Sequence, residues 1–311
     1  MKKIVLTGAT GFLGKKIIRK LIDRGDEICI LTRSAENAKK IFPTVNSIIE
    51  WSPDSNVWYS LLEGADAVIN LAGENVLARR WIEEHMRKIL SSRVNSVQSL
   101  ISAIEHVKNR PKVFISASAV GYYGNREEAV DENSKRGKDF MADVVTKWEN
   151  ETKKIDTFAV RRVNIRIGIV LDKKNGALAK MILPFKFFIG GSLGSGAQWF
   201  PWVHVDDVIG IFLFVLDNDN VNGILNAVSP NPVRMNEFCK TLGKVMKRPV
   251  LFKVPALALK IIFGEAAQVI LEGAKVYPNR TLETGYRFQY ENIESALKIF
   301  FPQTPNNIRS S

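Results

Sequence analysis

The chain has 311 residues, of which 46% are hydrophobic and 24% charged, and its 44 Lys and Arg against 32 Asp and Glu give a net charge of +12. This length and composition predict a globular protein with a substantial core and exclude a disordered chain. The basic residues are scattered in pairs rather than gathered with aromatics, no apolar stretch reaches the ~18 residues of a membrane span, and neither the two cysteines nor the three histidines show ligand spacing. We therefore expect a cytoplasmic protein with no nucleic-acid partner, no membrane and no metal.

Three glycines near the N-terminus, Gly8, Gly11 and Gly14, lie between an apolar run and a helical pattern. Residues 3–6 look like a buried parallel strand, and apolar residues recur at helical spacing over residues 12–21. Strand, glycine turn and helix are the order that a dinucleotide-binding unit requires: the first glycine permits the tight turn, the second lets the backbone approach a pyrophosphate, and the third lets helix and strand pack. We predict that a pyrophosphate binds at the N-terminus of this helix.

The end of the next apolar strand, residues 27–31, indicates which dinucleotide binds. Thr32, Arg33 and Ser34 follow it, about 20 residues past the last glycine, where NAD-binding proteins usually carry an acid. An acid would repel a 2′-phosphate on the ribose, whereas Arg33 can donate a bidentate pair of hydrogen bonds to it. We predict NADP(H) as the cofactor, with a solvated arginine at a strand end as the alternative.

Strands and helices alternate through the first two thirds of the chain. We predict further strands over residues 65–72, 112–116 and 160–169, with helices over residues 82–104 and 139–153 between them. Such alternation is typical of an α/β fold with a doubly wound parallel Rossmann sheet, whose ligands bind at the carboxyl ends of the strands.

The pattern changes beyond Val170. The glycine-rich residues 190–196 are expected to form a mobile loop near a ligand, because they are too rich in glycine for regular structure. An apolar helix follows, and Asp206 or Asp207 is predicted to cap its N-terminus.

The last third of the chain predicts a smaller, mainly helical C-terminal lobe that covers the sheet and takes part in substrate binding. Its helices are expected over residues 235–246, 256–273 and 293–301. We place an NADP-binding Rossmann domain over residues 1–220 and the small C-terminal domain over residues 221–311.

Several motifs follow one another in a fixed order along the chain. They are TGATGFLG at 7–14, NLAGEN at 70–75, Arg80-Trp81, Ser92-Arg93, SASAVGYYG at 116–124, KWE at 147–149, GSGAQW at 194–199, HVDD at 204–207, NAVSPNP at 226–232, and Gly264-Glu265 through Pro278-Asn279-Arg280. Together they resemble the extended short-chain dehydrogenase/reductase superfamily, and within it the epimerase family proteins of the NAD-dependent epimerase/dehydratase type that carry a C-terminal domain of unknown function like DUF1731. The resemblance covers nearly the whole chain.

The resemblance implies a set of cofactor-binding residues. These are Gly8, Thr10, Gly11, Phe12 and Leu13 at the pyrophosphate, Thr32 and Arg33 at the adenosine phosphate, Leu71, Ala72 and Gly73 on the adenosine-ribose side, and Arg93 and Arg166 as further cations on the cofactor side. For both Arg93 and Arg166, a plain surface salt bridge is the alternative.

The resemblance also implies a catalytic serine, a tyrosine that transfers a proton, and a lysine four residues later that lowers the pKa of the tyrosine. Ser118 matches the serine. Alignment on Glu149 places Met141 and Val145 at the tyrosine and lysine positions, and neither side chain can move a proton. The usual hydride-transfer chemistry is therefore in doubt.

Several residues could replace the missing pair: Tyr122 or Tyr123, Glu74, or Lys147 with Asp143. We take Tyr123 as the first candidate, although an unassisted tyrosine titrates near 10 and needs a nearby positive charge. The alternative for Tyr123 is a packed aromatic ring whose hydroxyl only bonds the backbone.

Two functions remain open from the sequence. The first is an NADP(H)-dependent oxidoreductase or epimerase that uses Ser118 and Tyr123 on a small hydroxyl or keto substrate, a nucleotide sugar being one candidate. The second is a catalytically idle NADP(H)-binding sensor or scaffold. Either could act as a monomer or a homodimer.

Overall fold

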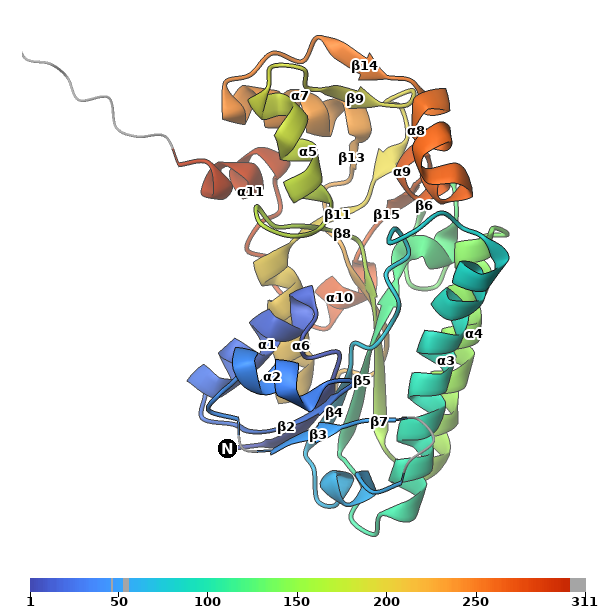
Figure 1. Ribbon diagram of the computed structural model, residues 1–311, viewed down its shortest axis with the longest axis vertical. Coiled ribbons are helices and arrows are strands. Elements are labelled where there is room, and N and C mark those ends of the chain that lie inside the picture. Colours follow the sequence, from blue (N-terminus) through green and yellow to red (C-terminus); the bar gives the residue numbers. More distant parts are fainter. Residues whose placement is uncertain (46, 53–55, 303–311) are drawn as a thin grey trace, which may run out of the picture.

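The computed structural model describes residues 1–45, 47–52 and 56–302 (Figure 1). Its centre is a seven-stranded sheet in the order β12-β7-β5-β4-β1-β2-β3, and every pairing in it is parallel. The strands are β1 (Lys3–Thr7), β2 (Glu27–Thr32), β3 (Ser47–Glu50), β4 (Ala67–Asn70), β5 (Val113–Ala119), β7 (Arg161–Ile167) and β12 (Gly223–Ala227). The predicted doubly wound Rossmann sheet is confirmed.

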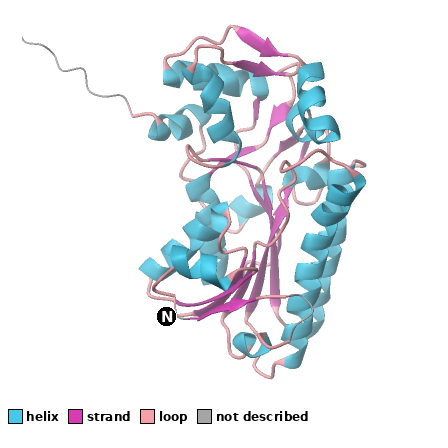
Figure 2. Cartoon of the chain, viewed as in Figure 1, coloured by secondary structure: helices cyan, strands magenta, loops and turns pink. Residues whose placement is uncertain are grey.

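Helices cover both faces of this sheet (Figures 1 and 2). On one face lie α1 (Phe12–Asp23), α2 (Ala35–Ile41) and α6 (Val205–Asp217), and on the other α3 (Glu83–His106) and α4 (Phe140–Thr152). Strand β1 alternates between two cores: Ile4 and Leu6 pack on the side of α1 and α6, while Val5 packs on the side of α3. Burial on both faces explains why the strand reads as one continuous apolar run.

A smaller lobe lies beyond the carboxyl ends of the strands, toward the top of Figure 1. Its helices are α5 (Gly176–Lys186), α7 (Met235–Met246), α8 (Ala256–Phe263), α9 (Gln268–Leu271) and α11 (Ile293–Phe300). Its short paired strands are β6 (Arg126–Val130) with β15 (Ala274–Val276), β8 (Ile169–Leu171) with β11 (Trp202–His204), β9 (Gly191–Leu193) with β14 (Phe252–Val254), and β10 (Trp199–Phe200) with β13 (Val233–Arg234). Trp202, Phe238 and Leu242 are fully buried in its core. The short helix α10 (Asn279–Glu283) instead packs on β12 of the central sheet, where the hydroxyl of Thr281 donates to the carbonyl of Asn226.

The division into lobes does not follow the expected boundary near residue 220. Strand β12 lies past that point yet pairs with β7 in the central sheet, while α5 and β9 lie before it and belong to the small lobe. The chain therefore crosses between the lobes more than once, which a single cut in the sequence cannot represent.

Three local expectations differ from the structure. The glycine-rich 190–196 contains strand β9, which pairs with β14 because Gly191 leaves room for the backbone of Phe252. The helix expected over residues 256–273 is interrupted at Gly264, whose φ is +61°. The N-cap of α6 is His204, whose Nδ1 accepts a hydrogen bond from the backbone N–H of Asp206 at 3.2 Å, rather than Asp206 or Asp207.

Asp207 has a different role from the predicted cap. Its carboxylate accepts hydrogen bonds from the backbone N–H groups of Gln289 and Tyr290 at 2.7 and 3.1 Å, and so anchors the C-terminal segment to α6. None of the described helices has the length and apolar character needed to cross a membrane.

Candidate functional site

A cavity of about 510 Å³ opens at the carboxyl ends of β1, β2 and β4. Eight of the predicted cofactor-binding residues line it together: Gly8, Thr10, Gly11, Thr32, Arg33, Leu71, Ala72 and Gly73. They come from three separate loops, which the parallel sheet brings to one edge.

The glycine turn fits closely under the neighbouring loop. Gly8 has a φ of +70°, and a Cβ there would lie 2.7 Å from the carbonyl carbon and oxygen of Leu71. A Cβ on Gly14 would lie 2.3 Å from the carbonyl oxygen of Gly8, so α1 can start this close to the turn only with glycine. The backbone is thereby exposed to the cavity with no side chain over it.

The start of α1 is suited to an anion. Its N-cap, Gly11, has no side-chain cap, and no acid occupies the first turn, so the helix presents free N–H groups and positive potential. Phe12 and Leu13 do not line the cavity; their side chains pack against the core, and only their backbone can face a pyrophosphate.

Arg33 directly follows β2 and lines one end of the cavity. Its side chain is exposed, and no hydrogen bond or ion pair joins it to another residue in the described part of the chain. Thr32, which is 8% exposed, lies beside it. The next residue, Ser34, is engaged elsewhere, because its hydroxyl accepts from the backbone N–H of Asn37 and caps α2.

Sequence reasoning missed seven residues that also line this cavity: Leu31, Trp51, Lys88, Ser91, Ser92, Asn95 and Ser96. The last five lie on one face of α3 at spacings of three and four residues, a polar stripe that helical periodicity could have identified. Trp51 follows β3, a strand that the sequence analysis did not predict.

Arg93 lies just outside the lining of this cavity. Its guanidinium packs against Gly73, donates to the carbonyl of Ile89 at 2.8 Å, and lies over the ring of Trp148 at 5.3 Å. Burial lowers the pKa of Arg93 to about 10, against the opposing charge of Glu74. It is therefore a partly desolvated cation next to the loop that follows β4.

Arg166 is not at the cavity but in a buried network with both predicted catalytic residues. Its guanidinium makes a bidentate pair with Glu149, at 2.8 Å from Nε to Oε1 and 2.6 Å from Nη2 to Oε2. Ser118 donates its hydroxyl proton to Oε1 of the same carboxylate at 2.6 Å. The pairing of β5 with β7 sets Ser118 directly beside Arg166.

Tyr123 completes this network and is fully buried. Its hydroxyl donates to Oδ1 of Asn226 at 2.8 Å and accepts from Nη1 of Arg166 at 3.0 Å. Burial raises the pKa of Tyr123 above its ordinary value, with Arg166 opposing the shift. In this arrangement the phenol has no free proton to offer a substrate, and it bonds side chains rather than the backbone.

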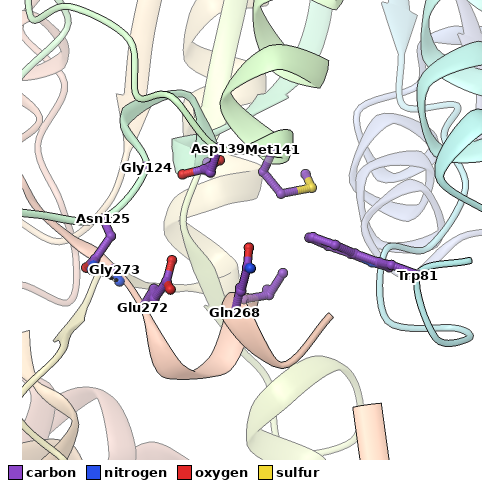
Figure 3. Close-up of a pocket in the computed structure, with 10 residues that line it drawn as sticks. Trp81, Gly124, Asn125, Asp139, Met141, Gln268, Glu272 and Gly273 are labelled. Carbon is purple, nitrogen blue, oxygen red and sulfur yellow. Dashed lines mark hydrogen bonds between the residues drawn. The ribbon is translucent and has the colours of Figure 1, made fainter. Parts of the chain in front are cut away.

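The position of the missing tyrosine faces a second, smaller cavity of about 70 Å³ (Figure 3). Met141 projects into it from the start of α4, and Trp81 forms another wall. Gln268 and Glu272 close it from α9 and the residue after it, so the C-terminal lobe contributes part of this cavity. Val145, at the position of the missing lysine, is buried in α4.

Two carboxylates line this small cavity. Asp139 caps α4 by accepting from the backbone N–H of Ala142 at 2.8 Å. The side chain of Glu272 is exposed, and its pKa is raised, first by partial desolvation and then by the charge of Asp139, while Lys260 opposes the shift. A carboxyl group with a raised pKa keeps its proton to a higher pH and can act as a proton donor.

Two family models match the chain. Residues 4–144 match the NAD dependent epimerase/dehydratase family, and residues 254–299 match a domain of unknown function, DUF1731. The second match includes α8, α9 and the residues that close the small cavity.

Known proteins are similar over nearly the full chain. An epimerase family protein SDR39U1 homolog from Arabidopsis thaliana, named as chloroplastic, is 42% identical over 298 residues, covering 95% of this chain and 85% of that protein. A crystal structure of human epimerase family protein SDR39U1 with NADPH is 34% identical with a TM-score of 0.84, covering 95% of this chain and 98% of that one. A nucleoside-diphosphate sugar epimerase from Corynebacterium glutamicum is 28% identical with a TM-score of 0.75, covering 96% of this chain and 57% of that one.

Proposed function

The chain belongs to the NAD-dependent epimerase/dehydratase family, and from that membership we propose that it binds NADP(H) and acts as an oxidoreductase or epimerase on a small hydroxyl or keto substrate. The observation that carries the proposal is the 510 Å³ cavity at the carboxyl edge of the sheet, which brings together the N-terminus of α1 and the exposed Arg33, a residue with no ion pair in the part of the chain that the structure describes. The human relative that was crystallised with NADPH supports the same cofactor.

The residues of this chain fit such a dinucleotide. The glycine turn leaves backbone room that a Cβ would fill at Gly8, and the free N–H groups of α1 would hold the pyrophosphate. Arg33 with Thr32 would hold the 2′-phosphate, and the polar face of α3 would lie along the ribose side. When bound, the nicotinamide supplies hydride transfer.

The cofactor proposal is tested by calorimetric titration of the protein with NADPH, NADP⁺ and NADH. We expect Arg33→Ala to weaken NADPH binding about 10- to 100-fold, or about 1.4–2.7 kcal/mol, because it removes charge-assisted hydrogen bonds to the 2′-phosphate. NADH binding should be unchanged. Arg19→Ala, on the exposed side of α1, is the matched control. Equal weakening of NADPH and NADH would contradict the role of Arg33.

We propose that Ser118 holds a hydroxyl of the substrate. Because its own proton goes to Glu149, its oxygen is left to accept a hydrogen bond rather than donate one. Arg166 would act through this carboxylate as a positioning residue, and Tyr123 would act through its hydrogen bond with Arg166.

The size of the cavity at Met141 favours a small substrate over a nucleotide sugar. It measures about 70 Å³, whereas sites for drug-sized ligands measure roughly 300–1,000 Å³. Within it, Glu272 is the group whose pKa is raised, and we propose it as the proton donor in place of the tyrosine.

This assignment predicts that Glu272→Gln abolishes the turnover of any substrate found by following NADPH oxidation, while NADPH affinity stays the same. Glu265→Gln, in the neighbouring turn, is the control. Full activity in Glu272→Gln would show that the proton comes from another group.

The second candidate function is a catalytically idle NADP(H)-binding sensor or scaffold. It is favoured by the network around Ser118, in which the hydroxyl protons of Ser118 and Tyr123 are both already donated within the protein. A sensor should prefer one redox form by about 100-fold, or about 2.7 kcal/mol, in the titration above. Comparable affinities for NADPH and NADP⁺, together with turnover of a substrate, would exclude it.

A cytoplasmic location remains a prediction for this chain. Both cysteines, Cys29 and Cys239, are buried and unpaired, which suits a reducing compartment. The Arabidopsis relative is named as chloroplastic. A monomer or a homodimer likewise remains a prediction.

A further inference from the structure

A group of large apolar side chains is exposed at one end of the small lobe. Six of the fourteen such side chains exposed in the described part of the chain lie there: Leu183, Phe187, Phe188, Ile189, Leu251 and Phe252. Phe187 is 67% exposed and Leu251 is 76% exposed. We call these six residues the apolar patch.

The apolar patch is continuous in space. Phe187, Phe188 and Ile189 form the connection from α5 to β9, and β9 pairs with β14 so that Gly191 lies opposite Phe252. Arg248, just before β14, lies 4.4 Å from the ring of Phe188. Both strands lie at the end of the molecule farthest from the central sheet (Figure 1).

Positive charge surrounds the apolar patch. Residues 173–205, which include α5 and β9, contain four lysines and no Asp or Glu. Residues 238–264, which include β14 and α8, contain five lysines and one arginine, again with no acid. The two segments that carry the apolar patch therefore contain nine lysines and one arginine, of which Lys244 is paired with Glu294 of α11 at 2.8 Å.

A basic cavity adjoins the apolar patch. It measures about 320 Å³ and is lined by Lys173, Lys174 and Lys186, with an apolar wall that includes Leu183 of the patch. Within residues 1–45, 47–52 and 56–302, no carboxylate pairs with any of these three lysines, although the ammonium of Lys173 lies 5.0 Å from the ring of Phe301. This cavity can accept an anionic head group.

We propose that this end of the molecule binds peripherally to the surface of an anionic lipid bilayer. Phe187, Phe188 and Leu251 would enter the boundary between head groups and acyl chains, while the surrounding lysines pair with lipid phosphates. Two effects would favour binding: burial of the exposed apolar side chains in the bilayer, and attraction of the nearby lysines to the anionic surface.

The charge pattern selects this partner over a second copy of the chain. A symmetric self-interface would place the lysine-rich surroundings of one patch against those of another, and like charges brought together oppose association. The expectation that no membrane takes part rested on the lack of a spanning segment, and binding on a surface needs none. The proposal revises that expectation and is independent of the proposed function.

The test is co-sedimentation of the full chain with phosphatidylcholine vesicles that contain or lack phosphatidylglycerol. We expect the protein to sediment with the anionic vesicles only, and less as salt rises. Phe187→Ser and Lys186→Glu should each reduce the partition coefficient about tenfold. Ile299→Ser, at an exposed isoleucine of α11, and Lys39→Glu, on α2, are the matched controls and should sediment as the wild type does.

Several outcomes would overturn the proposal. No sedimentation with anionic vesicles at low salt, or equal sedimentation with neutral ones, removes it. Loss of binding in the controls to the same extent as in the patch variants shows a nonspecific charge effect. A dimer in sedimentation velocity that Phe187→Ser dissociates assigns the patch to a self-interface instead. Leu251→Ser is a second patch variant, and circular dichroism shows that each variant is folded.

Discussion

At the scale of single residues, Arg166 illustrates how strand neighbours decide the role of a polar side chain. The sequence predicts a cation at the carboxyl end of a strand, and the structure places it there. The register of β5, β7 and β12 sets Ser118, Arg166 and Asn226 side by side, and Glu149 approaches from α4. A buried guanidinium needs a paired carboxylate, so this partner rather than the cofactor cavity fixes where Arg166 points.

A comparison of Gly8 with Gly64 separates two reasons for a glycine in the turn that follows β1: lack of space for a Cβ, and a backbone conformation that disfavours other residues. Both have positive φ, +70° and +65°, but a Cβ at Gly8 would lie 2.7 Å from the backbone of Leu71, whereas a Cβ at Gly64 would meet no atom of the described residues within 4 Å. We expect Gly64→Ala to cost about 1 kcal/mol of unfolding free energy and leave NADPH binding intact.

Gly8→Ala should cost more than this and abolish NADPH binding, because the loop after β4 must move. Urea unfolding and NADPH titration measure the two effects. Equal costs for the two variants, with NADPH binding kept in both, would show that the turn tolerates a side chain.

At the scale of elements, the N-cap of α6 makes part of the stability depend on pH. Burial lowers the pKa of His204 below its ordinary value of 6.5; Lys16 acts in the same direction, and Asp206 and Asp172 oppose it. As the pH falls, His204 therefore takes up a proton more readily in the unfolded chain than in the folded chain. This contribution to stability is complete above about pH 6.5 and is lost as the pH falls below that value.

We expect His204→Asn to remove this dependence, because asparagine keeps a cap acceptor and does not titrate. Urea unfolding at about pH 7.5 and about pH 5.5 measures the difference in unfolding free energy. The wild type should lose more stability than the variant on acidification, and His106→Asn, at an exposed histidine, should behave as the wild type does. The same loss in His204→Asn would assign the effect to other groups.

At the scale of the whole molecule, cofactor binding should stabilise the fold as a unit, because the cavity draws on β1, β2, β4, α1 and α3. NADPH at a hundredfold excess over its Kd should raise the unfolding free energy by about 2.7 kcal/mol. Differential scanning calorimetry should show the rise in Tm for the wild type and Gly64→Ala, and none for Gly8→Ala. A Tm unaffected by NADPH in the wild type would contradict binding to the folded state.

The parallel sheet, the glycine turn and the cluster of loops at one edge could be predicted from the sequence, because a strand buried on both faces and a helix packed on it have short, regular patterns. Eight of the residues that line the cavity could be named as cofactor-binding candidates, from the glycine pattern and from the resemblance to the family. The resemblance also placed Met141 and Val145 at the positions of the usual proton-transfer pair. The features that could not be predicted depend on contacts between distant segments.

Tertiary contacts engage the hydroxyl of Tyr123 with Asn226 and Arg166, and they bring Glu272 to the cavity at Met141. They also gather scattered lysines around one apolar end. Such pairings join residues tens to hundreds of positions apart, and no local periodicity encodes them, because they arise only when the strands take their order and the lobes pack.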